Sequence, residues 1–445
     1  MTNTTDSTTG RTGRPRKPPM GAGFNRLWAA STGSNLADGL GRTAVPLIAT
    51  TLTDDPLLIA GIASLVFVPW LLFGVLAGVI VDRVDRRVAM AVANGVRVLA
   101  ASSIALMIAT ESLTIWWLYA AIIIWGVGET IYDNATVAMV PSIVGKAGLE
   151  RANSRMQASD QLVQNFIATP IAGVLFAAAI VLPVIVTGAG FLMAAILALT
   201  LPVSAGRAAV DATAPVREPT TARADFREAF TYLWGNRLLR KFVLFSCIVG
   251  SLLAFAQATM VLLFLDTLAV PVVLIGFVTA AIGLGGLVGA LTASSLVARF
   301  GRGRVMLGAT LVGTAALVLT GLAPNVWVAC VAYAISAAGI SVWNVPWGAL
   351  RQDIVPGRLL GRVTGLNRSI VWGSFVVAGL IGGLVSRIDL RMPYIIGGGI
   401  AVLVTLVAAR MLLRVDASTA EHHASVAAHD EALANTAPDA TQPLR

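Results

Sequence analysis

Long apolar runs, separated by short polar segments, dominate the pattern along the chain. A helix of about 20 apolar residues crosses the hydrocarbon core of a bilayer and satisfies its own backbone hydrogen bonds there. Each run is long enough to do so, which predicts an all-α membrane protein with about twelve transmembrane helices. The runs lie at 25–50, 57–81, 88–110, 114–140, 155–178, 180–203, 240–265, 272–297, 304–323, 327–350, 364–386 and 392–412.

Composition supports a membrane protein and excludes several other classes. Of 445 residues, 56% are hydrophobic and only 12% are charged, whereas a soluble domain carries about 25% charged residues. The net charge of +9 does not indicate a nucleic-acid-binding protein, because the basic residues lie in short clusters between apolar runs. The two cysteines, Cys247 and Cys330, and three histidines near the C-terminus offer no metal site. Without a phosphate-binding loop or a nucleophile–base pair, we expect neither an enzyme nor a cofactor.

The distribution of Lys and Arg predicts the orientation of the chain. Basic clusters precede the first apolar run and follow the second, fourth, eighth and tenth runs. The opposite side carries mainly acids, including Asp54, Asp55 and Glu111. Cytoplasmic loops are enriched in Lys and Arg, so both termini are predicted to be cytoplasmic in a multi-pass protein of the plasma or inner membrane. The polar N-terminus lacks the pattern of a cleaved signal peptide, and we expect the first helix to be retained.

A polar, Arg-rich stretch divides the chain into two similar halves. We predict a polar tail at 1–24, a six-helix bundle at 25–203, a cytoplasmic linker at 204–239, a second bundle at 240–412 and a disordered tail at 413–445. Within the linker, Phe226, Phe230 and Leu233 have the spacing of an amphipathic helix on the membrane surface. Residues 132–144 align with residues 343–355 at a constant offset of 211 positions, which indicates an internal repeat.

The loop after the second run carries a glycine, acids and arginines at a characteristic spacing. Residues 78–87 read Gly-Val-Ile-Val-Asp-Arg-Val-Asp-Arg-Arg. This resembles the loop signature of the major facilitator superfamily, Gly-x-Leu-Ala-Asp-Arg-x-Gly-Arg-Lys, with Asp85 in place of the second glycine. The resemblance covers nearly the whole chain and implies two pseudo-symmetric six-helix bundles around a central cavity.

In that family the motif latches the cytoplasmic ends of the two halves together. A glycine lets two helices approach closely, and an aspartate accepts hydrogen bonds from helix amides or pairs with arginine. We therefore expect an Asp82–Arg86–Asp133 latch, although the arginines could instead serve only to orient the chain. The latch residues implied by the resemblance are Gly78, Asp82, Arg83, Arg86 and Asp133.

Other stretches resemble the exporter branch of the superfamily, which contains the enterobactin and macrolide efflux proteins. These stretches include residues 35–39, 133–141 and 149–153. In the fifth predicted helix, Pro170 and Gly173 partly match the Gly-Pro-x-x-Gly-Gly element of antiporters. The membrane arginine of many drug/proton antiporters is absent, and Ile122 stands at its position. The resemblance favours export with an incomplete standard coupling apparatus.

Ionisable residues within the predicted spans are costly to bury and are therefore functional candidates. Asp38 and Arg42 lie four positions apart with the acid first, which favours an intrahelical ion pair. Glu129 has no basic partner within four residues on its own helix. Because burial penalises the charged form of a carboxyl group, Asp38 and Glu129 are the candidate proton carriers. Arg42 and Arg97 are their candidate charge partners, and Asp38 could instead serve only as a structural partner of Arg42.

A further set of residues is predicted to line the central cavity. Trp125 shares a stripe with Glu129, and Trp343 shares one with Trp347 on the repeat-related helix. Aromatic rings beside a buried acid suit amphipathic or cationic substrates, whereas packing or lipid contact explains these tryptophans equally. Asp160 could likewise serve only to bond helices together. The cavity candidates are Trp125, Asp160, Gln164, Gln257, Trp343, Asn344 and Trp347.

Together these features predict a secondary active transporter that works as a monomer. The expected activity is proton-coupled efflux of an amphipathic small molecule, such as a drug, an antibiotic or a siderophore, by alternating access. One alternative is uptake or facilitated exchange of a nutrient, which would need hydrogen-bonding groups on both halves of the cavity. A second alternative is a non-transporting membrane sensor or scaffold, which would tolerate neutralisation of Asp38 and Glu129.

Overall fold

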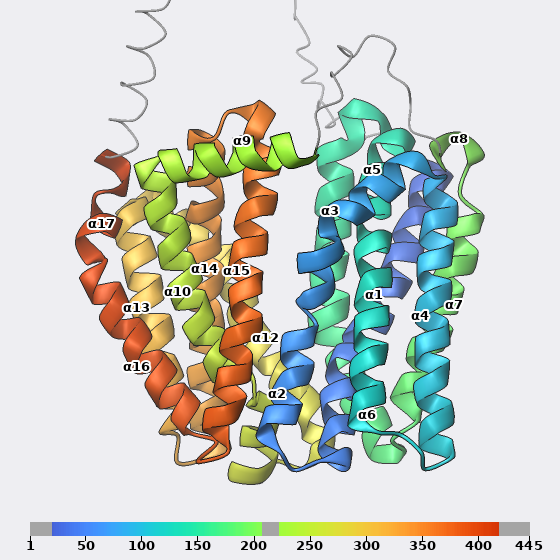
Figure 1. Cartoon of the computed structure of the whole chain (residues 1–445), viewed down its shortest axis with the longest axis horizontal. Coiled ribbons are helices and arrows are strands. Elements are labelled where there is room, and N and C mark those ends of the chain that lie inside the picture. The colour runs from blue at the N-terminus through green and yellow to red at the C-terminus, as the bar shows by residue number, and fades with distance from the viewer. Residues whose placement is uncertain (1–19, 207–221, 418–445) are drawn as a thin grey trace, which may run out of the picture.

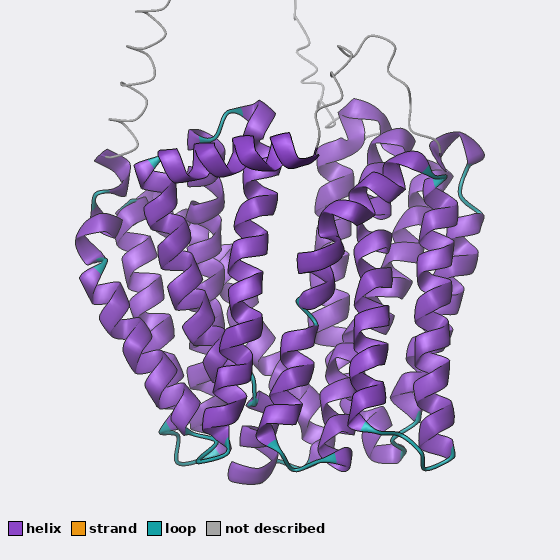
Figure 2. Cartoon of the chain, in the orientation of Figure 1, coloured by secondary structure: helices purple, strands orange, loops and turns teal. Residues whose placement is uncertain are grey.

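The computed structural model describes residues 20–206 and 222–417, and their regular structure is entirely helical (Figure 2). Most of the predicted tails, at 1–19 and 418–445, and the 207–221 part of the linker lie outside these residues, whereas 21–24 begin α1 and Leu413 ends α17. The first half comprises α1 (Gly21–Leu52), α2 (Pro56–Leu65), α3 (Val68–Arg83), α4 (Arg86–Ala109), α5 (Ile115–Leu162), the π-helix η1 (Val163–Ala168), α6 (Thr169–Ala178), α7 (Leu182–Leu199) and α8 (Val203–Gly206). The second half comprises α9 (Ala222–Gly235), α10 (Arg237–Gln257), α11 (Met260–Leu262), the π-helix η2 (Leu263–Thr267), α12 (Val272–Phe300), α13 (Arg302–Gly321), α14 (Val326–Ile354), α15 (Gly357–Ser386), α16 (Met392–Val407) and α17 (Ala409–Leu413).

Within the described residues, ten segments are long and apolar enough to cross a membrane. They include a continuous span through α2 and α3 and another that runs from the second part of α5 through η1 into α6. The 32-residue α1 and the shorter apolar α16 pack in the same two bundles without being among the ten. All twelve predicted apolar runs therefore fall on helices, and the all-helical membrane fold is confirmed.

Local sequence signals set several helix boundaries. The side chain of Asp55 accepts a hydrogen bond from the backbone N–H of Leu57 at the start of α2, and Asp85 accepts one from Arg87 at the start of α4. Asn236 caps α10 in the same way. Such caps satisfy amides that have no partner within the helix. Gly145, at φ 65°, introduces the bend that separates the two spans of α5.

The two halves stand beside each other in Figure 1, with α1–α7 in blue to green and α10–α16 in yellow to red. They pack together mainly where α6 meets α12 and where α2 meets α15. We call the end that carries the loops at 53–55 and 387–391 the Asp55 end, and the opposite end, which carries α9, the α9 end. In Figure 1 the α9 end is at the top.

The halves are in close contact at the Asp55 end. A Cβ added at Gly276 of α12 would overlap the carbonyl oxygen of Thr169 and lie 2.8 Å from the Cα of Pro170 on α6. A Cβ at Gly383 of α15 would similarly overlap the side chain of Ala60 on α2. Glycine lets helix backbones approach this closely. The Asp55 end is therefore a tight seam between the two halves.

An ion pair also joins the halves at this end. Arg387, just after α15, donates from Nε to Oδ1 of Asp55 at 2.8 Å and from Nη2 to Oδ2 at 2.5 Å. The Arg387 hydrogen bonds hold the pKa of Asp55 below its usual range. The pair is consequently present at neutral pH and is lost only when the pH falls through that lowered pKa.

The α9 end has a different character. A Cβ added at Gly74 or Gly78 of α3, or at Gly365 of α15, would meet no atom within 4 Å. The sequence predicted that Gly78 lets two helices approach closely, and this is wrong for the present conformation. The helix faces at these three glycines therefore have open space beside them, although α3 and α15 contact each other nearby through Trp70 and Trp372.

The linker helix α9 packs against the second half. Ala229 and Leu233 are almost fully buried, and the hydroxyl of Tyr232 donates to the carbonyl of Ile354 at 2.8 Å. Glu228 also forms an ion pair with Arg362 of α15 at 2.6 Å. The predicted amphipathic helix therefore exists, but it buries its apolar face on the bundle, while Phe230 stays exposed and stacks on Trp234.

We predict that Gly276→Ala loosens the seam at the Asp55 end, because its Cβ has no room beside Thr169. The readout is maleimide labelling of a Thr169→Cys reporter, with Cys247 and Cys330 replaced by serine. Thr169 is only 6% exposed, so labelling should be slow in the parent and about tenfold faster with Gly276→Ala, as expected for overpacking worth 1–3 kcal/mol.

Gly399→Ala of α16 is the matched control for this prediction, because its Cβ enters open space and α16 packs against helices of the second half. It should leave the labelling rate unchanged. Equal labelling in both glycine variants would contradict the tight seam.

Candidate functional site

A cavity of about 890 Å³ lies between the two halves. Its wall contains residues from α1 and α2, with Phe67 just before α3, of the first half and from α10, α11, α12, α13, α14 and α15 of the second. Four of the predicted cavity residues line it: Gln257, Trp343, Asn344 and Trp347. The other three, Trp125, Asp160 and Gln164, are not among its lining residues and belong to a network inside the first half.

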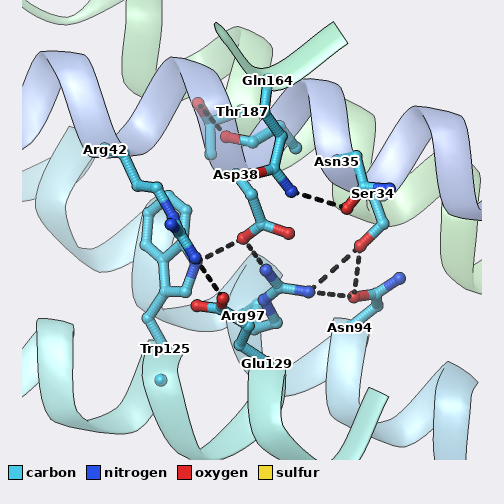
Figure 3. A network of polar contacts seen from close by, with 12 residues as sticks. Ser34, Asn35, Asp38, Arg42, Asn94, Arg97, Trp125, Glu129, Gln164 and Thr187 are labelled. Carbon is cyan, nitrogen blue, oxygen red and sulfur yellow. Dashed lines mark hydrogen bonds and ion pairs between the residues drawn. The ribbon is translucent and has the colours of Figure 1, made fainter. Parts of the chain in front are cut away.

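The centre of that network is the fully buried guanidinium of Arg97 on α4 (Figure 3). Arg97 forms an ion pair with Asp38 of α1 and donates to Ser34 Oγ at 3.1 Å and Asn94 Oδ1 at 2.9 Å. The ring of Phe191 on α7 lies 3.9 Å from its Cζ. Four helices thus enclose one charge, which is the arrangement that a cation needs away from water.

Asp38 has a second partner in Trp125 of α5. The indole Nε1 donates to Asp38 Oδ1 at 3.0 Å, and the ring packs edge-on against Phe191 with centroids 5.0 Å apart. Trp125 therefore fixes the Asp38–Arg97 pair instead of facing the cavity, contrary to the sequence prediction. Gly128 makes room for Arg97, because a Cβ there would lie 2.7 Å from the Arg97 side chain.

Arg42 and Glu129 form a separate ion pair between α1 and α5. The expected intrahelical Asp38–Arg42 pair is wrong, because each residue bonds across to another helix. Their surroundings also differ: 49% of the Arg42 side chain is exposed and Arg42 lines the cavity, whereas Glu129 is 10% exposed. Arg42 thus connects the cavity with a buried carboxylate.

Asp133 lies one helical turn beyond Glu129 on α5. It interacts electrostatically with Glu129, Arg97 and Arg42, and no hydrogen bond or ion pair of its side chain occurs among the described residues. Asp133 therefore belongs with the Arg42–Glu129 pair and not with the predicted latch.

The other latch residues are placed as follows. Arg86 donates to the carbonyl of Ala138 at 2.8 Å and to Ser142 Oγ at 3.1 Å, so the expected Arg86–Asp133 contact is wrong. Arg83 is exposed at the end of α3. The side chain of Asp82 lies outside the described part of the structure.

The internal repeat is visible in one of these contacts. Arg302 at the start of α13 forms an ion pair with Asp353 of α14 at 2.5 Å. Asp353 corresponds to Ser142 under the offset of 211 positions, and Arg302, like Arg86, stands at the start of the helix that follows a loop. The same arginine-to-helix contact therefore occurs in both halves.

Asp160 and Gln164 bond to α1 next to the π-helix η1. Asn35 donates to Asp160, and Gln164 Nε2 donates to Asn35 Oδ1 at 2.8 Å. These contacts are the helix-to-helix bonds that the sequence left open as the alternative for Asp160. Pro170 and Gly173, the antiporter-like pair, lie in the seam with α12, where a Cβ at Gly173 would be 3.1 Å from the Gly276 nitrogen.

Two arginines in the second half of the cavity wall were not predicted as site residues. Arg368 lies with its Cζ 3.9 Å from the ring of Trp372 and 4.5 Å from that of Trp70. Arg351 lies 5.5 Å from the ring of Trp347. The basic cluster after the tenth run, which contains Arg351, served in the sequence only as an orientation signal. For Arg368 the available signal was an arginine at membrane depth with no acid nearby in sequence.

Several polar atoms in the cavity wall have no hydrogen-bond partner in the described structure. Such atoms are costly to bury and usually bind water or a ligand. They are Ser64 Oγ, Ser246 Oγ, Ser336 Oγ, Arg351 Nε and Asn367 Oδ1.

A profile of the family described as transmembrane secretion effector matches residues 17–441. The chain belongs to the transmembrane secretion effector family of the major facilitator superfamily. It is similar to the uncharacterized MFS-type transporter YfiS of Bacillus subtilis, with 25% identity over 393 residues that cover 86% of this chain and 92% of YfiS. The family membership agrees with the resemblance seen in the sequence and makes the chain a multi-pass membrane transporter.

Two further relatives are similar to this secretion effector over about a third of their own lengths. The enterobactin exporter EntS of Shigella flexneri is 35% identical over 147 residues, 32% of this chain and 36% of EntS. Macrolide efflux protein A of Streptococcus pyogenes is 24% identical over 153 residues, 34% of this chain and 38% of that protein. Among solved structures, a mutant of the nucleoside transporter NupG matches with a TM-score of 0.73 at 14% identity, covering 88% of this chain and 99% of NupG. That likeness shows the shared fold.

We predict that Asp38→Asn strongly destabilises the protein, because it leaves the Arg97 charge buried without a countercharge. The expected loss is about 3–5 kcal/mol, measured as the free energy of unfolding of the purified protein in a denaturant titration. The double variant Asp38→Asn/Arg97→Met removes both charges and should recover much of the loss.

Asp353→Asn makes the same chemical change at an ion pair that is about one-third exposed. It should cost at most about 1 kcal/mol. If Asp38→Asn were as mild as this control, the buried pair would not hold the first half together.

Proposed function

We propose that this transporter exports an amphipathic small molecule, of the drug, antibiotic or siderophore kind, in exchange for protons. Export is supported by the names of two partial relatives, an enterobactin exporter and a macrolide efflux protein. We infer that the α9 end faces the cytoplasm, because Arg83, Arg86 and the basic residues Arg237, Arg240 and Lys241 at the start of α10 lie there.

Alternating access is supported by the difference between the two ends. The glycines at the Asp55 end leave no room for a Cβ, whereas those on α3 and α15 toward the α9 end face open space. In our proposal these open surfaces come together when the transporter closes toward the cytoplasm, while the seam of α6 with α12 and of α2 with α15 separates. Gly78, on the open face of α3, is then the residue that allows the close approach.

The single observation that carries the coupling proposal is the position of Arg42. It lines the cavity and also holds Glu129 in an ion pair. Protonation of Glu129 breaks that pair, so the cavity wall changes when a proton arrives. We propose Glu129 as the proton carrier. Asp133, one helical turn away, is the carboxylate with which Glu129 exchanges the proton.

Asp38 is a weaker candidate for this role. Its pair with Arg97 is enclosed by α1, α4, α5 and α7, and the Arg97 side chain has no exposed surface. A proton carrier must meet water on each side in turn, and Asp38 has no comparable link to the cavity. We therefore propose that Asp38 fixes the helix arrangement.

Transport in proteoliposomes tests the function. Vesicles with an imposed pH gradient would be loaded with macrolides, siderophores or lipophilic dyes, and flux would be followed for wild type and Glu129→Gln. We predict that the gradient drives flux in wild type and that Glu129→Gln abolishes this gradient-driven component while substrate exchange without a gradient continues. Substituting the carrier removes coupling but leaves the cavity in place.

Glu111→Gln serves as the matched control, because Glu111 is an exposed acid at the Asp55 end. It should transport like wild type. Wild-type flux that ignores the pH gradient would contradict proton coupling, and full gradient-driven flux in Glu129→Gln would exclude Glu129 as the carrier.

A further inference from the structure

The charged residues of the cavity wall all have one sign. Its charged lining residues are Arg42, Arg351 and Arg368, and no aspartate or glutamate is among the lining residues. Arg42 is neutralised by Glu129 behind the wall. Arg351 and Arg368 form no ion pair with any described carboxylate. The second half of the cavity therefore carries two guanidinium groups that form no direct ion pair with a described carboxylate.

We propose that Arg351 and Arg368 bind the anionic group of the transported molecule, so that the substrate class is an amphipathic organic anion. This inference rests on the proposed transport function and adds the chemistry of its cargo. A carboxylate or sulfonate group would face the two arginines, and an apolar or aromatic body would lie along the remaining wall.

Arg368 is oriented for such an anion. Its guanidinium is held against the rings of Trp372 and Trp70, with centroids 3.9 and 4.5 Å from Cζ. The two rings come from α15 and α3, so both halves of the protein position this group. The side chain is exposed to the cavity and donates no hydrogen bond to any described residue. A stacked guanidinium keeps its edge donors available, and these match the two oxygens of a carboxylate.

Arg351 also lacks a partner, and because its Nε is buried the missing hydrogen bond costs more free energy than at Arg368. Its Nε is buried and unbonded, and the ring of Trp347 lies 5.5 Å from Cζ. Burying a charged donor without an acceptor is unfavourable. An anion in the cavity would supply the missing acceptor, and the unbonded Ser246, Ser336 and Asn367 side chains in the same wall offer additional polar contacts.

A cationic substrate fits this wall poorly. The sequence suggested that tryptophans would attract a cation, but the rings of Trp70, Trp347 and Trp372 already contact the arginines of the protein. Glu129 and Asp133 of the first half interact electrostatically with Arg368 without forming an ion pair with it. A like-charged substrate would be repelled by the two unpaired guanidinium groups.

The apolar part of the wall suits a flat substrate body. Trp343 stacks near Phe242 and Phe245, with ring centroids 6.3 and 5.1 Å apart. Of these rings, Trp343 and Phe245 line the same cavity as the two arginines. An anion is also driven outward by a membrane potential that is negative inside, so export of this class is favourable independently of proton coupling.

Binding of three fluorescent probes that share a dansyl body and differ in the charge of the attached group tests the proposal. N-dansylglycine is an anion, its methyl ester is neutral, and N-dansylethylenediamine is a cation at neutral pH. Binding to the purified full-length protein in lipid nanodiscs would be measured by energy transfer from tryptophan to the dansyl group. We expect the anion to bind about tenfold more tightly than the ester, the size of one charge-assisted hydrogen bond, and the cation to bind most weakly.

Substitutions of the two arginines test whether the preference for the anionic probe arises in the cavity. Arg368→Gln and Arg351→Gln should each weaken binding of the anion about tenfold and leave the ester unchanged, which also shows that the variants are folded. Arg368→Lys should retain part of the preference, because it keeps the charge but loses the planar fork. Arg304→Gln, an exposed position outside the cavity, is the matched control and should bind like wild type.

Equal or tighter binding of the ester or the cation would overturn the proposal. So would an anion preference that survives in both glutamine variants, or a failure of the cavity to bind any of the three probes. Failure of the transport function is distinguishable: anion-selective binding without flux refutes transport and supports the anion site, whereas flux through a cation-selective cavity refutes the anion site alone.

Discussion

Arginine side chains within a membrane bundle must find an anion or water, and this requirement organises the present structure. The first half meets it internally, because Arg97 pairs with Asp38 and Arg42 pairs with Glu129. The second half does not, because Arg351 and Arg368 have no carboxylate partner among the described residues. The pairs rigidify one bundle, and the unpaired charges give the cavity its sign. The same physical cost therefore produces a structural network on one side and a binding surface on the other.

Arg42 links these two regions. It forms part of the cavity wall, while its partner Glu129 lies behind that wall next to Asp133. In our proposal, a change of protonation at Glu129 alters the cavity, whereas Asp38 and Arg97 are enclosed by four helices. Such a change can act on the packing of the two halves, because the glycines at the Asp55 end are in tight contact while Gly74, Gly78 and Gly365 face open space. A rigid first half and a separable seam are what rocking of two bundles requires.

Apolar run length predicted the helices well, because a membrane span is a local property of about 20 residues. The partners of charged residues were not local. The i, i+4 rule paired Asp38 with Arg42. In the structure, Asp38 instead forms an ion pair with Arg97 and Arg42 forms one with Glu129, both from other helices. Trp125 was placed in the cavity because its stripe also carries Glu129, but a stripe does not show which neighbouring helix it faces. Arg351 was missed because an arginine near a helix end is expected to orient the chain.

The central claim is that the two ends of the transporter open in alternation, and distances between spin labels on the two halves test it most directly. One pair of labels would replace Arg83 and Arg304 at the α9 end, and a second pair would replace Glu111 and Ile388 at the Asp55 end, all exposed positions. Distances would be measured in lipid nanodiscs at neutral and at mildly acidic pH. We predict that acidification shortens the first distance and lengthens the second in the same population. Two distances that stay constant, or that lengthen together, would contradict the account.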